Sequence, residues 1–180
     1  MAKQWIAFFS QTGSEIVAIA KATGTKPDLI VTNNIDESVY AYHPELRNLG
    51  VVIQSGKHLA LMEYFSNDNP YHPENTIITL HGYLRIIPPS VCEKYEMFNG
   101  HPGFITLYPE LKGKDPQVRA WEGKYHNIGS VVHKVTPGVD EGEVVSQLCF
   151  VNRTSSLDEL FGVLKQSSLQ SWLWFLKGKI

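Results

Sequence analysis

The stretch Thr76-Ile77-Ile78-Thr79-Leu80, "TIITL", decides the fold class, because it is apolar without the strict alternation of a half-buried strand. Three earlier runs share this property, namely "AFF" at 7–9, "LIV" at 29–31 and "VVI" at 51–53. Strands that read this way are buried on both faces, as in a parallel sheet covered by helices. We therefore predict an α/β fold with an open, mostly parallel, doubly wound sheet of the Rossmann-like type, and ligands beyond the carboxyl ends of its strands.

Helical patterns alternate with these runs. Ile16, Ile19 and Ala20 recur at helical spacing in "GSEIVAIAKATG", where Gly24 is a stop signal, and a second helix is expected over 56–68. Residues 37–50 are expected to be irregular, with Pro44 breaking any helix. In the second half we expect short helices over 88–96 and 115–123, strands over 97–103, 128–138 and 142–152, and a long amphipathic C-terminal helix over 155–179. Asp115 is expected to cap the second short helix, and a Ser-Ser-x-Asp/Glu signal at 155–159 to cap the last helix.

Composition and charge narrow the class of protein. The chain has 180 residues, 43% of them hydrophobic, and a net charge of −2, so we expect one globular domain over 1–180 and no nucleic-acid partner. No apolar run is long enough to span a bilayer, and the N-terminus reads as a first strand and not as a signal peptide. Cys92 and Cys149 lie far apart, which favours reduced thiols, a cytoplasmic location and no metal site.

The segment "FNGHPG", Phe98–Gly103, holds the first candidate functional side chains. Residues two apart in an extended chain point to the same face, so Asn99 and His101 would project side by side at a strand end. An imidazole suits a general acid or base, and a neutral amide can donate to a developing oxyanion. A turn in which Asn and His bond only to the local backbone would show the same spacing. Because so short a pattern often matches by chance, spacing alone favours such a turn over a catalytic pair.

Two further turns carry candidate residues. Asp140, in "VTPGVDEGEVV", is either an ordinary hairpin aspartate or a carboxylate that orients His101 or a water molecule. "SQTGSEI" is a strand-to-helix turn with a single glycine, so it could hold an anion but supports a dinucleotide site only weakly. Arg85, where the fourth strand ends, is either a surface residue or a ligand contact. The remaining histidines, including His81 and His133, are taken as structural or surface residues because no metal spacing links them.

Several segments in order resemble the folate-dependent formyltransferases. They are "FFSQTGSEIVAI", "LHGYLRIIPPSVCEKY", "NGHPG", "LYPELKG", "RAWEG", "GSVVH" and "VDEGEVV". The resemblance runs from about Ile6 to Trp174, nearly the whole chain, and is most specific from Leu84 to Val145. The resemblance is greatest to the branch that formylates glycinamide ribonucleotide. In that family an Asn-x-His-Pro segment and an Asp-x-Gly turn some forty residues later form a catalytic trio. Asn99, His101 and Asp140 match it in type and order.

The resemblance implies the ligands. The donor would be 10-formyltetrahydrofolate, a cosubstrate, and the acceptor a small-molecule amine, with a homodimer as a possible assembly. Main-chain contacts to the folate ring are implied from Leu84, Arg85, Ile86 and Ile87 and from the loop that runs from Val135 through Val139 to Asp140. The acceptor would be held at Gly13, Ser14 and Glu15. No covalent enzyme intermediate is needed, because the amine attacks the formyl carbon directly.

Three positions depart from the glycinamide ribonucleotide branch. Glu15 stands where that branch has Asn, Ser168 stands near its acidic residue on the last helix, and Gly103 replaces Ser. Because of these departures, glycinamide ribonucleotide, which is formylated in purine biosynthesis, is only the leading candidate for the acceptor. There are three alternatives. The protein could be a formyltransferase that acts on another amine, such as an amino sugar nucleotide, a hydrolase that uses water as the acceptor, or a catalytically idle folate- or nucleotide-binding module.

Overall fold

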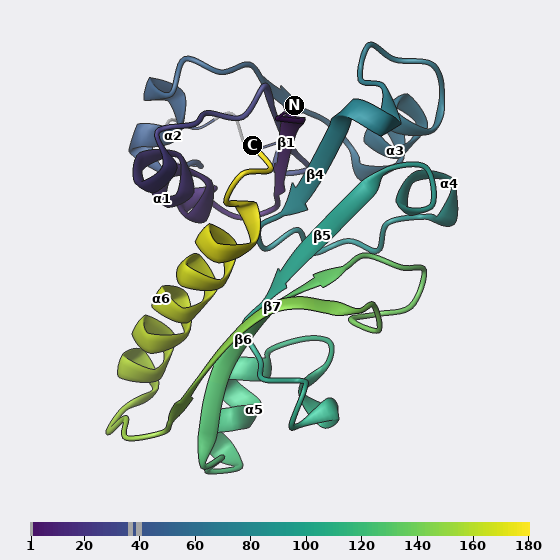
Figure 1. Cartoon of the computed structure of the whole chain (residues 1–180). Helices are drawn as coiled ribbons and strands as arrows, with labels where there is room; N and C mark the ends of the chain where they lie inside the picture. Colours follow the sequence, from purple (N-terminus) through teal and green to yellow (C-terminus); the bar gives the residue numbers. More distant parts are fainter. Residues whose placement is uncertain (1, 36–37, 39–40) are drawn as a thin grey trace.

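A computed structural model describes residues 2–35, 38 and 41–180. It contains one seven-stranded sheet with strand order β3-β2-β1-β4-β5-β6-β7 (Figure 1). The strands are β1 (Gln4–Phe9), β2 (Leu29–Thr32), β3 (Ile53–Ser55), β4 (Thr76–Leu80), β5 (Glu96–His101), β6 (Asn127–Lys134) and β7 (Val144–Val151). The first five are parallel, and β6 and β7 are antiparallel to their neighbours, which confirms the predicted mostly parallel α/β sheet.

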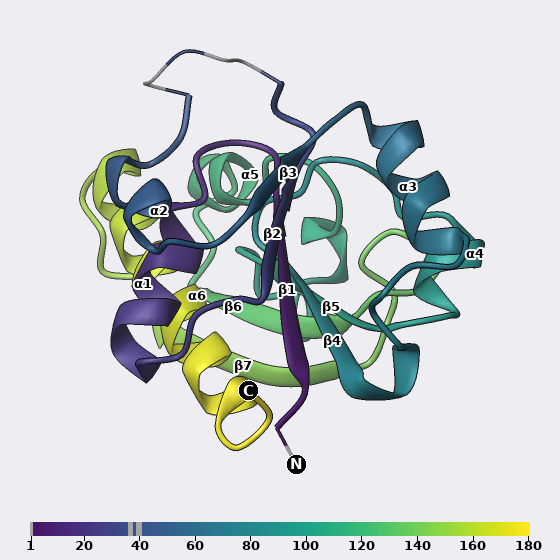
Figure 2. The same ribbon diagram turned by 90° about the horizontal axis from the view of Figure 1, so that it is seen from above.

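Six α-helices and two short 3-10 turns are described, and the α-helices lie on both sides of the sheet (Figure 2). The α-helices are α1 (Ser14–Thr23), α2 (Pro44–Asn48), α3 (His58–Ser66), α4 (Pro89–Cys92), α5 (Pro116–Glu122) and α6 (Leu157–Leu176), and the 3-10 turns are η1 (Pro73–Asn75) and η2 (Pro109–Leu111). Helix α1 ends at Gly24 in the left-handed conformation, and the Ser156 side chain caps α6 by accepting from the Glu159 N–H, both as predicted.

Three sequence-based expectations are wrong. The run 51–53 is not a strand buried on both faces, because β3 begins at Ile53, lies at the edge of the sheet and is only half-buried, and Val52 is 70% exposed. Pro44 does not break a helix but begins one, because at the first helical position its missing N–H and fixed φ cost nothing. Of the remaining residues in that expected irregular segment, 37 and 39–40 lie outside the described part of the chain. Asp115 precedes α5 but its side chain makes no capping hydrogen bond, and its φ of 51° places it in the left-handed region.

The two faces of the sheet are packed by different helices. Side chains from α3 and α4 join alternate residues of β1, β2, β4 and β5 in one apolar cluster, which includes Phe65, Val91 and Met97. Side chains from α1 and α6 cover the opposite face with Ile16 and Trp172. Strand β5 therefore passes between two packed layers, and its two sets of alternate side chains reach different environments.

The described helices include none that is long and apolar enough to cross a membrane.

Candidate active site

Asn99 and His101 lie near the carboxyl end of β5 and share one face of it. Antiparallel pairing places His133 of β6 directly opposite Asn99. The intervening Gly100 faces the other way, because a Cβ there would lie 2.6 Å from Nε1 of Trp172 in α6. The predicted amide and imidazole thus project together from the face that α3, α4 and α5 cover.

Asp140 completes this cluster from the loop that joins β6 to β7. Its Oδ2 lies 3.3 Å from Nδ1 of His101, and its Oδ1 lies 3.2 Å from Nε2 of His133. The Asn99 amide nitrogen donates to Oδ1 of Asp140 at 3.4 Å and lies 3.2 Å from Nε2 of His133. The structure therefore brings together the three residues predicted for catalysis and adds His133, which sequence analysis took as structural or surface.

The backbone of the Asp140 loop is held in an uncommon conformation. Asp140 has a φ of 52°, in the left-handed region. Two residues later a Cβ on Gly142 would lie 1.8 Å from the Lys134 carbonyl oxygen, so only glycine fits there. That carbonyl also bonds Nδ1 of His133 at 2.9 Å. The Asp-x-Gly spacing noted in the sequence is thus explained by the close approach of the loop to β6.

The surroundings perturb the pKa values of both acid–base residues. Burial raises the pKa of Asp140, but the hydrogen bond from His133, the charge of His101 and the Gly113 N–H outweigh it and lower the pKa to about 2. Burial lowers the pKa of His101, against the opposing influence of Asp140 and the Leu111 carbonyl. Asp140 is therefore ionised at neutral pH beside an imidazole that is disposed to be neutral, the arrangement a general base requires.

His101 is enclosed on its second side as well. Its Nε2 lies 2.9 Å from the Leu111 carbonyl, and only 4% of the residue is exposed. Both ring nitrogens thus face oxygen acceptors, so a neutral ring can donate to only one of them.

The residues predicted to hold the folate ring lie where β4 ends. Leu84 and Ile86 are 66% and 67% exposed, whereas Ile87 is buried, and Arg85 is exposed. The Leu84 N–H donates to the Ser10 hydroxyl at 2.8 Å. Exposed apolar side chains next to a buried strand end suit a flat aromatic ligand.

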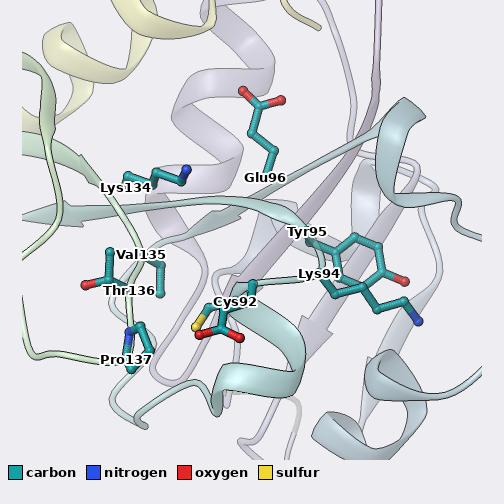
Figure 3. A pocket seen from close by; sticks show the side chains of 9 residues that line it. Cys92, Lys94, Tyr95, Glu96, Lys134, Val135, Thr136 and Pro137 are labelled. Atoms are coloured by element: carbon teal, nitrogen blue, oxygen red, sulfur yellow. The ribbon is translucent and has the colours of Figure 1, made fainter.

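The other two predicted folate contacts flank the trio. Val139 directly precedes Asp140 and is 49% exposed, while Val135 follows His133 on the same face and packs in the core. A pocket of about 560 Å³ lies between the start of β5 and the end of β6 (Figure 3). Val135 lines it together with Cys92, Tyr95 and Pro137, but the 84–87 segment does not.

The predicted acceptor residues lie at the N-terminus of α1. Gly13 caps the helix with a φ of 74° and packs against Leu46. The Glu15 carboxylate turns toward the sheet: its Oε2 lies 2.8 Å from Nδ1 of His81, and its Oε1 accepts from the Ser168 hydroxyl at 2.5 Å. Burial raises the pKa of Glu15, but the hydrogen bonds and the His81 charge outweigh it and hold the pKa below its ordinary value.

His81 links this carboxylate to the core. Its Nε2 lies 2.8 Å from the Thr79 hydroxyl, which accepts from the Trp5 indole at 2.7 Å. The chain of bonds is consistent when Thr79 donates to Nε2 and Nδ1–H donates to Glu15. Sequence analysis missed this role of His81, which only the proximity of α1, β4 and α6 reveals.

In the described part of the chain, no three His, Cys, Asp or Glu side chains gather in a way that could hold a metal ion.

Comparison with known proteins identifies a matching family and similar folds. A sequence profile of the formyl transferase family matches residues 54–167. The chain superimposes on phosphoribosylglycinamide formyltransferase from Streptococcus pneumoniae with a TM-score of 0.79 and 21% identity, covering 97% of each chain. For the enzyme from Campylobacter jejuni the TM-score is 0.81 and the identity 18%, over 98% of this chain and 97% of that one. Glycinamide ribonucleotide transformylase 1 from Symbiobacterium toebii gives 0.80 and 20%, over 97% and 86%.

Proposed function

Because this chain belongs to the formyl transferase family, whose members take the formyl group from 10-formyltetrahydrofolate, we propose that it transfers that group to a primary amine through Asn99, His101 and Asp140. The observation that carries the proposal is the contact of Asp140 with both Asn99 and His101 at the carboxyl end of β5. In open α/β sheets this end is where ligands bind.

Each residue type has a role that its surroundings support. The amine nitrogen forms a bond to the formyl carbon while the bond from that carbon to the folate nitrogen breaks. With Nε2–H donated to the Leu111 carbonyl, Nδ1 of His101 would accept the proton that the amine loses and return it to the leaving folate nitrogen, so protons balance. Asn99 would donate to the formyl oxygen as it gains negative charge, after releasing its present acceptor, Oδ1 of Asp140. Asp140, ionised and fixed by Gly113 and His133, would orient His101.

The folate ring would lie against Leu84–Ile87 and the loop 135–140. The exposed side chains of Leu84, Ile86 and Val139 support this placement. If main-chain groups make the ring contacts, Arg85→Ala weakens folate binding only modestly. A crystal soaked with a folate analogue tests the placement, and a ligand seated far from this segment would overturn it.

Glycinamide ribonucleotide is the acceptor we propose first, which would place the enzyme in purine biosynthesis. Its phosphate would rest on the N–H groups of Gly13 and Ser14 at the start of α1. The engagement of Glu15 with His81 and Ser168 supports this, because it draws the carboxylate toward the sheet. Glu15→Gln removes the remaining negative charge, so we expect it to lower KM for glycinamide ribonucleotide by a few-fold, up to about tenfold.

The activity is tested by incubating the protein with 10-formyltetrahydrofolate, alone and with glycinamide ribonucleotide or an amino sugar nucleotide. Turnover that requires an amine supports the transferase. Turnover without an amine would instead identify a hydrolase, and binding without turnover would identify a folate-binding module. A higher KM in Glu15→Gln, or no reaction with glycinamide ribonucleotide, would refute that acceptor but leave the transferase open to the amino sugar nucleotide.

We also propose that the enzyme acts in the cytoplasm, which two free cysteines support, and that it forms a homodimer through β7. Support for the dimer comes from the position of β7 at the edge of the sheet and from its sequence, which has no charged residue and no proline. Such edges pair readily with a second strand. Sedimentation of the wild-type protein and of Val145→Lys tests the dimer. The proposed dimer is refuted if both proteins sediment as monomers.

A further inference from the structure

One short loop contacts both acid–base residues of the trio. The Leu111 carbonyl lies 2.9 Å from Nε2 of His101, and the Gly113 N–H donates to Oδ2 of Asp140 at 2.8 Å. Gly113 adopts a φ of 83°, which favours glycine. The orientation of His101 and Asp140 relative to each other therefore depends on the conformation of residues 110–114.

The side chain of Arg119 fastens this loop. From α5 its Nη2 donates to the carbonyls of Leu111 at 3.1 Å and Lys112 at 2.8 Å, and its Nε donates to the Lys114 carbonyl at 3.0 Å. Its Nη1 donates to the Glu110 carbonyl. One guanidinium thus bonds four carbonyls of the loop, which its planar fork of five N–H donors permits and a lysine could not reproduce.

The Leu111 carbonyl joins the two sets of contacts, because it lies within hydrogen-bonding distance of both the Arg119 guanidinium and the His101 ring. We propose that Arg119 is a positioning residue for formyl transfer, which holds loop 110–114 so that Leu111 and Gly113 fix His101 and Asp140 in their reacting orientation. The proposal rests on the proposed function, since it assigns Arg119 a role through the trio. Arg119 itself contacts neither His101 nor Asp140 directly.

Outside the trio, the other described side chains secure only the start of the loop, where Leu111 is buried and packs with Ile105, Ala120 and Val131. Among the described residues, the Tyr125 hydroxyl donates to the Glu110 carboxylate at 2.7 Å, at the far end from Gly113. The side chain of Asp115 makes no capping bond to α5, so it does not fix the junction between the loop and the helix. Removing the guanidinium would therefore leave the carbonyls of Lys112 and Lys114 without their side-chain donor and residues 112–114 free to shift, while the Leu111 carbonyl would keep only the His101 ring.

Arg119 also acts on His101 through its charge. The groups that face His101 are Asp140, the Leu111 carbonyl, His133 and Arg119. Of these, His133 and Arg119 lower the pKa of His101 through their positive charge. Removing Arg119 should raise the pKa of His101. If neutral His101 is the base, the acid limb of the rate profile then moves to higher pH.

The experiment compares Arg119→Ala and Arg119→Lys with wild type, and with Arg153→Ala as a matched control, since Arg153 is an exposed arginine outside the loop. Kinetics with 10-formyltetrahydrofolate and glycinamide ribonucleotide should show kcat about 10- to 100-fold lower in Arg119→Ala, the size of a small misplacement of reacting groups. KM for both substrates should stay within about threefold, and Arg119→Lys should recover only part of kcat.

Two readouts do not depend on turnover. Histidine-selective nitrogen NMR follows the His101 ring, and hydrogen exchange follows the Gly113 amide. In Arg119→Ala we expect altered His101 ring resonances and faster exchange at Gly113, with the thermal midpoint close to that of Arg153→Ala. Unchanged resonances and exchange would overturn the proposal, whether or not glycinamide ribonucleotide is a substrate. A His101→Ala variant that turns over normally would instead refute the proposed function.

Discussion

At the scale of single residues, the trio depends on two side chains that are nearly withdrawn from solvent. The side chains of His101 and Asp140 are only 5% and 11% exposed. We expect His101→Ala and Asp140→Asn each to lower kcat by roughly 100- to 10,000-fold, as the loss of a positioned acid–base group does. Steady-state kinetics checks this, with circular dichroism to show that each variant is folded. Rates near that of wild type would remove the residue concerned from the mechanism.

Sequence reasoning reached some of these residues and not others, for a physical reason. Asn99 and His101 share one strand, so the two-residue repeat of an extended chain predicts that they lie together. His133 and Arg119 join them only through strand pairing and the return of α5 over its preceding loop. Those contacts depend on tertiary packing, which a local pattern does not encode.

At the scale of elements, β5 and α6 are in close contact at Gly100. A Cβ there would lie 2.6 Å from Nε1 of Trp172, which is fully buried. We therefore expect Gly100→Ala to destabilise the protein by about 1–3 kcal/mol, as overpacking does. Gly162 in α6 is the matched control, because no atom lies within 4 Å of a Cβ added there. Gly162→Ala should stabilise the helix by about 0.5–1 kcal/mol. Urea unfolding measures both, and equal effects of the same sign would contradict the packing described.

The order of elements was well predicted from the sequence, and their ends less well. Continuous apolar runs identified β1, β2 and β4, because burial on both faces leaves no room for alternation. The run 51–53 overlaps the edge strand β3 only at Ile53, and its burial was overestimated. Pro44 was misread because proline begins a helix as readily as it breaks one, and the outcome depends on the residues around it. The Glu15 contact could not be foreseen, since it joins α1 to α6 across 153 positions of the chain.

At the scale of the whole molecule, charge and stability are coupled through Asp140. Its pKa falls from the ordinary 3.8 to about 2 on folding, so the unfolded chain binds more protons between these values. The resulting stabilisation, roughly 2 kcal/mol, is complete above pH 4 or so and disappears as the pH falls through about 2.

We therefore expect the free energy of unfolding of wild type to decline steeply below about pH 4, and that of Asp140→Asn to decline less over the same interval. Glu15, whose pKa is also lowered, steepens the decline in both proteins from its ordinary value of 4.5 downward. Urea unfolding at a series of pH values measures the slopes. Parallel curves for the two proteins would mean that the pKa of Asp140 is not lowered by folding.

The polar contacts of the trio and those of Glu15 join residues that lie far apart in the sequence, and this separation has a consequence for how the protein is made. Asn99 and Asp140 are separated by 41 positions. Asn99 lies in β5 and Asp140 follows β6, and these two strands pair with each other. Glu15 meets Ser168 only across 153 positions. On the ribosome the chain is made from its N-terminus, so all three residues of the trio are synthesised before α6. The carboxylate of Glu15 gains its last partner only when translation is nearly complete, and the proposed acceptor end of the site is therefore completed last.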